Sequence, residues 1–382
     1  MKRILLVHNF YKEFGGEDSN FNEELDFFKQ FLEVDIFTEN NSSKTSYSDL
    51  ISFFLRSNFR NNKNFKNKLD QFKPDVVYIH NTWYKINLGI FKILKDRNIE
   101  TVLKIHNFRY QCSRYFLAKN HLGSLKVCNA CGYKLNNKSF FNKYYQESAL
   151  KSLFLILYSK KLRKILLSNN IKIFVLNKFH LNQILKFGVN QENVEIFYNP
   201  IKTFKKIQYE DKAPYIIYAG RISKEKGVEE LLESWISAKI KNHKLLIIGD
   251  GPLRNELQER FESNEISFLG NIDNSKVKNY ITNSKAVITA TKIYEGQPRL
   301  LCEASSLGTI SIYPSFGGMN EFFPSEYSFS FEQYNYIDLV HKIKLLSNED
   351  LVKKNMENIY LHIQKILNQN NLKLQFYKII KN

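Results

Sequence analysis

Two cations near the middle of the chain have the types and spacing to grip a diphosphate. An apolar run, 215–219, ends at Gly220, Arg221 follows at once, and Lys226 comes five residues later, just before a helical pattern. Arg221 offers a rigid guanidinium fork and Lys226 a compact point charge, and both groups suit phosphate oxygens. The alternative for one isolated pair is two surface cations in a connecting loop. The pair therefore needs support from other loops.

Two carboxylates follow a later apolar run. Glu295 lies in a loop, and Glu303 falls in the second turn of a helix that Pro298 is suited to open. Carboxylates accept hydrogen bonds from neighbouring sugar hydroxyls, and the free amides around 296–299 suit a phosphate or a hydroxyl. A solvated helix residue is the alternative for Glu303. We expect both carboxylates to face one ligand.

Glycine pairs stand in two further loops. Gly15 and Gly16 come just before the first helical pattern, where glycine lets backbone approach a ligand and a helix N-terminus favours an anion. Gly317-Gly318 follows a later apolar run and predicts another loop that faces a phosphate. Neither pair forms the G-x-G-x-x-G of dinucleotide-binding proteins, so NAD or FAD receives little support.

Strands and helices must position these loops, and their alternation along the chain predicts parallel α/β sheets. The pattern is met twice, which predicts two Rossmann-like, doubly wound sheets facing each other across a cleft lined by the carboxyl ends of their strands. The runs expected as strands are 4–7, 34–37, 76–79, 101–105, 173–176 and 194–197, then 215–219, 245–248, 266–269, 286–289 and 310–312.

The length of 382 residues suggests two domains, at about 100–200 residues each. A strand ends near Asn199-Pro200, and the polar stretch 202–212 follows. We therefore predict an N-terminal domain over 1–200 and a C-terminal domain over 201–365. The final segment, 366–382, is helical by spacing and should pack on the domains or cross back between them.

The net charge of +18 is compatible with nucleic acid, an anionic membrane surface or acidic small substrates as partner. The alternative is the bias toward Lys, Asn, Ile and Phe that an AT-rich genome imposes without any partner. Between residues 138 and 172, eight Lys or Arg accompany one acid, with apolar residues at helical spacing, and 53–73 repeats the theme. Such helices suit an anionic bilayer, although plain surface helices look alike. Because no nucleic-acid motif accompanies the charge, we expect no nucleic-acid partner.

No apolar run approaches the ~18–20 residues of a membrane-spanning helix, and the first run is short enough to be a strand. Four cysteines make no disulfide framework, so we expect a cytoplasmic protein. Cys128 and Cys131 form a C-x-x-C, and Cys112 precedes them; with His106 or His121 they have the ligand types for zinc. Reduced loop thiols are the favoured alternative.

Together these motifs resemble the group 1 family of retaining GT-B glycosyltransferases (glycosyltransferase family 4), of the type found in bacterial capsule and O-antigen polysaccharide biosynthesis. The resemblance covers most of the chain. The motifs that carry it are Gly220-Arg221 with Lys226, Glu295 with Glu303, Gly317-Gly318 with Glu321, His8-Asn9 with Gly15-Gly16-Glu17-Asp18, and Lys104-Ile105-His106-Asn107.

The resemblance implies a nucleotide-diphosphate sugar as donor, held mainly by the second domain, with no cofactor and no metal for catalysis. Arg221 and Lys226 would bind the diphosphate and stabilise it as it leaves. Glu303 would bind the ribose, Glu295 the transferred sugar, and His106 would lie near that sugar. The residues expected at the donor are Gly15, Gly16, Gly220, Arg221, Lys226, Gly296, Gln297, Pro298 and Glu303.

We therefore expect a cytoplasmic enzyme, peripheral on the inner face of the membrane, that moves a sugar to a lipid-linked saccharide acceptor with retention of configuration. Where relatives often have Phe-Gly or Phe-Pro, this chain has Gln297-Pro298, so the hydroxyl pattern of the donor sugar stays open. The alternatives are another GT-B nucleotide-sugar enzyme, such as an epimerase or a phosphorylase-like enzyme, and, much less favoured, a basic nucleic-acid-binding protein.

Overall fold

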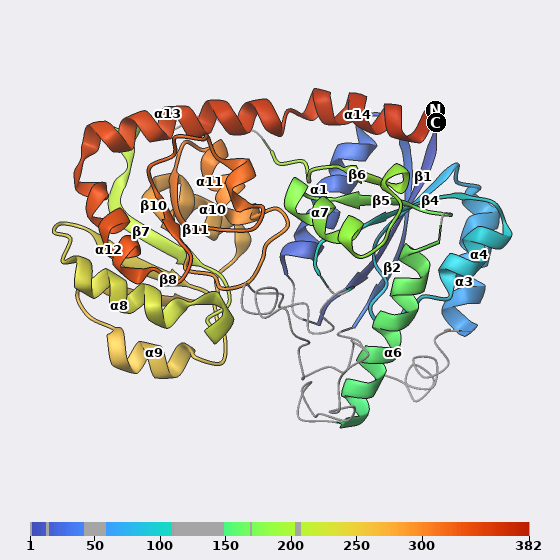
Figure 1. Cartoon of the computed structure of the whole chain (residues 1–382), viewed down its shortest axis with the longest axis horizontal. Helices are drawn as coiled ribbons and strands as arrows, with labels where there is room; N and C mark the ends of the chain where they lie inside the picture. The colour runs from blue at the N-terminus through green and yellow to red at the C-terminus, as the bar shows by residue number, and fades with distance from the viewer. Residues whose placement is uncertain are drawn as a thin grey trace. The chain divides into compact units, whose positions relative to one another are not determined.

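A computed structural model describes residues 2–12, 15–41, 59–108, 110, 149–168, 170–202 and 208–381 (Figure 1). The chain divides into two compact units. The N-terminal unit comprises Met1–Pro200 together with Asn370–Asn382, and the C-terminal unit comprises Ile201–Gln369. The last helix of the chain therefore belongs to the unit in which the chain begins.

The N-terminal unit is built on a six-stranded parallel sheet in the order β2-β1-β3-β4-β5-β6. Every residue of β3 is buried, as in parallel strands that are covered on both faces. The strands are β1 Arg3–Phe10, β2 Glu33–Asn40, β3 Val76–Asn81, β4 Glu100–Lys104, β5 Lys172–Val175 and β6 Val194–Ile196. The helices are α1 Gly16–Lys29, α3 Phe59–Phe72, α4 Ile90–Asp96, α6 Ala149–Leu166, α7 Lys178–Lys186 and α14 Gln369–Lys381.

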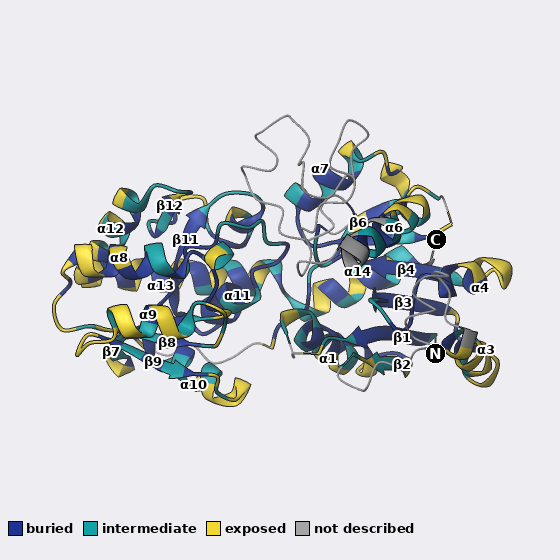
Figure 2. Ribbon diagram, turned by 90° about the horizontal axis from the view of Figure 1, so that it is seen from below, coloured by how far each residue is buried: buried dark blue, intermediate teal, exposed yellow. Residues whose placement is uncertain are grey.

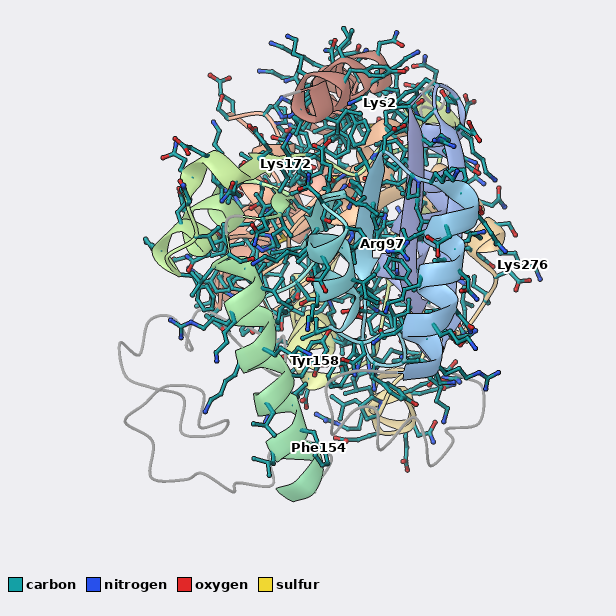
Figure 3. All side chains as sticks on the ribbon, turned by 90° about the vertical axis from the view of Figure 1, so that its right-hand side faces the viewer. Lys2, Arg97, Phe154, Tyr158, Lys172 and Lys276 are labelled. Carbon is teal, nitrogen blue, oxygen red and sulfur yellow. The ribbon has the colours of Figure 1, made fainter. Side chains whose placement is uncertain are left out.

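The last helix, α14, packs on the sheet of the N-terminal unit beside α1. The Phe376 ring lies 4.6 Å from Phe28 and 5.7 Å from Phe197, centroid to centroid, and all three side chains are fully buried. Lys2 and Lys172 donate hydrogen bonds from Nζ to the last carbonyls of α14, where a cation complements the helix dipole (Figure 3). Residues near the two ends of the chain, Lys2 and Ile380, are therefore in contact.

The C-terminal unit is built on a second six-stranded parallel sheet, in the order β12-β11-β10-β7-β8-β9. In Figure 2 many of the exposed residues of this unit lie on its outer helices, such as α8 and α9. The strands are β7 Ala213–Ala219, β8 Lys244–Ile248, β9 Ile266–Gly270, β10 Ser284–Ile288, β11 Ile310–Ser315 and β12 Ser330–Glu332. The helices are α8 Val228–Ala238, α9 Arg254–Phe261, α10 Asn274–Asn283, α11 Arg299–Ser306, α12 Tyr336–Lys344 and α13 Glu349–Ile366.

The two parallel sheets confirm the predicted α/β fold class. Several strands extend beyond the runs expected from the sequence, and two differences have a clear physical reason. The edge strand β12 is absent from that pattern, because its three residues are too few to show a period. Strand β2 runs to Asn40 rather than ending near residue 37, and its partly exposed edge position explains why its second half reads as polar.

Candidate functional site

The loops after β7 and β8 touch backbone to backbone at the carboxyl edge of the second sheet. The Ile222 amide donates to the Asp250 carbonyl at 2.8 Å, and the Leu253 amide donates back to the Ile222 carbonyl at 3.2 Å. Gly249 has φ +129°, and a Cβ there would lie 2.0 Å from the Gly220 carbonyl oxygen. Only glycine fits so close an approach, so Gly249 allows the loop of Gly220 and Arg221 to pack against the loop after β8.

A third loop joins this edge through Gly227 and Lys226. Gly227 has φ +66°, and a Cβ there would lie 2.1 Å from the carbonyl oxygen of Ala290, which follows β10. This close approach lets Lys226 Nζ reach Glu295 Oε1 at 2.6 Å. Both side chains are a little under 30% exposed, so the ion pair stays open to solvent. The structure thus brings together Lys226 and Glu295, two residues that are 69 positions apart in the sequence.

Glu303 is held separately, on the first turns of α11. Its Oε1 lies 2.8 Å from Nη2 of Arg299, and the two side chains are 10% and 14% exposed. Gln297 is buried directly before the helix, and Pro298 is its N-cap residue. Cys302 is a buried free thiol. Glu303 is therefore a nearly buried carboxylate oriented by a guanidinium group.

The fourth loop expected at the site contacts the loop of Glu295. A Cβ at Gly317, which has φ +59°, would lie 2.5 Å from the Tyr294 ring, and the centroid of the Phe316 ring lies 5.0 Å from that of Tyr294. Gly220 and Arg221 lie in the loop after β7, where the Tyr218 hydroxyl donates to the Arg221 carbonyl at 2.7 Å. Cations, carboxylates and glycine turns of this unit thus gather on neighbouring loops of one sheet edge.

In the N-terminal unit, Asp18 secures the Gly15-Gly16 turn. The Gly15 amide donates to Asp18 Oδ2 at 2.9 Å, and His8 Nε2 lies 2.8 Å from Asp18 Oδ1. His8 and Asp18 are completely buried. The residues of this sequence motif are therefore in contact, and the buried Asp18 carboxylate links the glycine turn to His8 of β1.

The partly buried His106 lies after β4, beside the buried His80. Its Nε2 is 3.0 Å from Nδ1 of His80, and the two rings stack with centroids 5.2 Å apart. Behind His80 lie the buried side chains of Glu24 and Lys104, which form an ion pair. Sequence reasoning missed both His80 and Glu24. The sequence does contain one signal for this cluster, because His80 and Lys104 are polar residues near the ends of otherwise apolar strands.

The zinc candidates Cys112, Cys128 and Cys131 lie outside the described residues, as does His121. Within the ranges that the structure describes, no three His, Cys, Asp or Glu side chains gather as metal ligands would.

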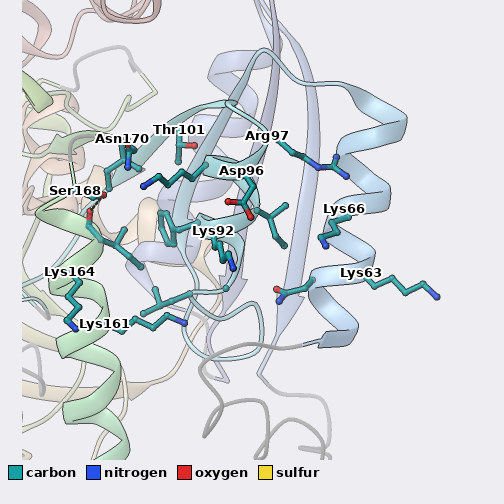
Figure 4. Close-up of a pocket in the computed structure, with 18 residues that line it drawn as sticks. Lys63, Lys66, Lys92, Asp96, Arg97, Thr101, Lys161, Lys164, Ser168 and Asn170 are labelled. Atoms are coloured by element: carbon teal, nitrogen blue, oxygen red, sulfur yellow. Dashed lines mark hydrogen bonds between the residues drawn. The ribbon is translucent and has the colours of Figure 1, made fainter.

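A cationic groove of about 890 Å³ runs along α4 between α3 and α6 (Figure 4). Its floor is partly apolar, with Phe91 and Ile171 almost fully buried. The charged residues that line it are Lys63, Lys66, Lys92, Lys95, Arg97, Lys161 and Lys164, against the single acid Asp96. Helix α3 lies in the basic segment 53–73 identified in the sequence, and α6 lies in the basic segment 138–172. No helix among the described residues combines the length and hydrophobicity needed to cross a bilayer.

Residues 201–376, slightly under half of the chain, match the family described as "Glycosyl transferases group 1". The amylovoran biosynthesis glycosyltransferase AmsD of Erwinia amylovora is 26% identical over 163 residues, which cover 42% of this chain and 45% of AmsD. The GPI3 subunit of the phosphatidylinositol N-acetylglucosaminyltransferase of Saccharomyces cerevisiae is 28% identical over 149 residues, 37% of this chain and 32% of that protein. The chain thus spans less than half the length of these curated relatives.

The fold is shared over the whole chain with a solved structure, Alr3699/HepE of Anabaena in complex with UDP and glucose. The TM-score is 0.70 at 11% identity, with complete coverage of both chains. At this identity the likeness shows the fold alone, which is GT-B with two Rossmann-like units.

Proposed function

We propose that this chain, whose residues 201–376 match the group 1 glycosyltransferases, transfers a sugar from a nucleotide-diphosphate sugar to a saccharide acceptor. The observation that carries the proposal is the sheet edge at which Lys226 pairs with Glu295 on loops shared with Arg221 and Gly317. Those loops all lie within the part of the chain that matches the family.

In this proposal Arg221 and Lys226 bind the donor diphosphate. Negative charge builds up on the diphosphate as the sugar leaves, so cations already in position stabilise the transition state more than the bound donor. Glu295 holds Lys226 at 2.6 Å, and because the pair is partly exposed to solvent the ammonium group can turn toward a phosphate. Two cations supply the stabilising charge, so we propose transfer without a metal ion.

Glu303 is proposed to bind the ribose and Glu295 the transferred sugar. Arg299 orients the Glu303 carboxylate through Oε1 at 2.8 Å. A carboxylate held in this way accepts hydrogen bonds from two vicinal hydroxyls with little loss of side-chain entropy. Uridine diphosphate is the first nucleotide to test, because the structurally similar HepE was solved with UDP and glucose.

The acceptor is proposed to be a lipid-linked saccharide at the cytoplasmic face of the membrane, in the synthesis of a bacterial surface polysaccharide such as capsule or O-antigen. The cationic groove supports this placement, because each basic residue near an anionic bilayer contributes about 1 kcal/mol. Replacing Lys66, Lys92 and Lys164 together by Gln should lower partitioning into anionic vesicles about a hundredfold. Replacing three exposed lysines of the other unit, Lys239, Lys241 and Lys244, is the matched control and should have little effect.

The test of the donor begins with thermal unfolding of the full chain in the presence of UDP, GDP, ADP and their sugars. A ligand at about 100 times its Kd stabilises the native state by about 2.7 kcal/mol, which raises the melting temperature by several degrees. The variant Glu303→Gln should lose most of this shift, whereas Glu332→Gln, an exposed carboxylate on the edge strand, should retain it.

The nucleotide sugar that binds is then incubated with saccharide acceptors, with and without a chelator. Release of the nucleoside diphosphate only when acceptor is present supports transfer, and NMR of the product shows whether the anomeric configuration is retained. Conversion of the sugar without acceptor would instead indicate an epimerase. Absence of binding by every nucleotide would contradict the proposal.

A further inference from the structure

A line of polar side chains crosses the buried interior of the N-terminal unit and ends at His106. Lys104 Nζ pairs with Glu24 Oε1, Glu24 Oε2 lies 3.1 Å from His80 Nε2, and His80 Nδ1 lies 3.0 Å from His106 Nε2. The side chains of Lys104, Glu24 and His80 have no exposed surface at all. The line joins α1, β3 and β4, three elements far apart in the sequence.

A buried ion pair of this kind is weak evidence for stability. Removing two charges from water is expensive, and well-packed apolar side chains often replace such pairs without loss. Burial raises the pKa of Glu24 and lowers that of Lys104, and the charge of each partner opposes the shift of the other. Lys104 Nζ also lies 4.9 Å from the centroid of the Phe197 ring, a contact that favours the charged ammonium group. The pair therefore places a fixed carboxylate against His80.

The carboxylate decides where the proton sits on His80. Burial lowers the pKa of His80 and of His106 well below the ordinary value, so each ring carries one proton. A carboxylate oxygen 3.1 Å from Nε2 of His80 favours a proton on that nitrogen through its negative charge, although the two atoms do not have the geometry of a hydrogen bond. Nδ1 of His80 is then an acceptor, and Nε2 of His106 must donate to it.

In this arrangement Nδ1 of His106 carries no proton, and its lone pair can accept a hydrogen bond. That atom is buried and makes no hydrogen bond within the described part of the chain. His106 lines a hollow of about 50 Å³ at the carboxyl ends of β3 and β4, together with His80, Asn107 and Glu17. A buried acceptor without a partner is costly, so the position suits a ligand that brings a hydroxyl group.

We propose that Lys104, Glu24 and His80 are positioning residues that fix His106 in the tautomer with its proton on Nε2, so that Nδ1 accepts a hydrogen bond from a hydroxyl of the sugar substrate. The inference rests on the proposed function for the identity of the ligand, but the tautomer itself does not depend on it. In this tautomer His106 is a neutral acceptor. It orients a hydroxyl group and has no proton on Nδ1 to donate to the leaving group.

The first test is the tautomer of the two histidines in the wild-type full chain. Nitrogen-15 NMR of histidine-labelled protein distinguishes protonated from unprotonated ring nitrogens, and the variants His80→Asn and His106→Asn assign the signals. The inference requires the proton on Nε2 in both rings. A proton on Nδ1 of His106 would overturn the inference, whether or not the protein has transferase activity.

The second test uses Glu24→Gln to reverse the direction of the hydrogen bonds along this line of side chains. The amide oxygen of the introduced side chain should turn to the Lys104 ammonium group and its NH2 group to Nε2 of His80, which moves the proton of each ring to Nδ1. Tyr78→Phe is the matched control: it removes a hydroxyl 3.3 Å from Glu24 Oε1 in the same buried cluster and should leave both tautomers unchanged. Glu24→Asp, which keeps the carboxylate, should restore part of the wild-type pattern.

Kinetics connect the tautomer to the reaction. With the donor and acceptor that the wild type uses, Glu24→Gln should lower kcat about a hundredfold, because an acceptor has become a donor at the ligand, while Tyr78→Phe stays close to wild type. Inverted tautomers with unchanged kcat would overturn the role in positioning, and so would unchanged tautomers in folded Glu24→Gln. A wild type without transferase activity would contradict the proposed function alone, because the NMR result stands by itself.

Discussion

Replacing Lys226 by Met separates the two roles that its ammonium group can have, in folding and in catalysis. The ion pair with Glu295 is 2.6 Å long, but both partners are a little under 30% exposed, so solvent screens it and its contribution to the free energy of unfolding is at most about 1 kcal/mol. A cation that stabilises a departing diphosphate contributes more, about 2.7–4 kcal/mol of the activation free energy.

We therefore expect Lys226→Met to fold with nearly the wild-type melting temperature and to lose about 10²- to 10³-fold in kcat, with a smaller change in KM. The assay follows release of the nucleoside diphosphate at saturating donor and acceptor, with unfolding in urea measured in parallel. Arg260→Met is the control, since Arg260 makes an ion pair of the same length, 2.6 Å, with Glu229 on the surface of the same unit.

The control should keep kcat within about threefold of wild type, as expected for a surface substitution. A Lys226→Met variant with wild-type kcat would refute the reasoning. Equal losses in both variants would also refute it, because general electrostatic attraction of the donor would then explain the effect.

Three further predictions concern stability. Gly249→Ala should unfold at a lower urea concentration, because φ +129° is strained for alanine, which costs about 1–3 kcal/mol, and because its Cβ would also lie 2.0 Å from the Gly220 carbonyl oxygen. Wild-type stability of this variant would contradict the close approach. Burial lowers the pKa of Lys212 to about 7, so the unfolded chain binds more protons above that pH. The wild type should gain about 2 kcal/mol over Lys212→Met between pH 7 and 9, and a flat or falling difference would count against it. Phe376→Ala should cost about 3–5 kcal/mol, whereas Leu374→Ala, at a position 60% exposed, should change stability by under about 0.5 kcal/mol; equal effects would argue against docking of α14 on the first unit.

The fold class was predictable from local patterns, because strands buried on both faces read as short apolar runs between helical segments. Strand Val76–Asn81 is of this kind. The docking of α14 was not predictable in the same way. Its apolar stripe shows that Phe376 needs a buried partner, but only the tertiary structure shows that the partners include Phe28 and Phe197.

The candidate site likewise contains residues that the sequence indicates and residues that only the tertiary structure reveals. Loop residues such as Arg221, Lys226 and Glu295 stand out in the sequence because cations, acids and glycines follow strands. Gly249 did not stand out, since its close approach to Gly220 depends on two loops meeting in space. Glu24 resembles a solvated helix residue among other acids, and only its burial against Lys104 distinguishes it.

The central claim is that the loops of the C-terminal unit hold a nucleotide-sugar donor, and photolabelling tests it most directly. The full chain is irradiated with an azido-uridine derivative of a UDP-sugar, digested and analysed by mass spectrometry, with unlabelled UDP as competitor. We predict competable adducts on peptides from the loops around residues 220–227 and 291–303. Adducts confined to peptides of residues 2–200, or labelling that UDP does not reduce, would contradict the account.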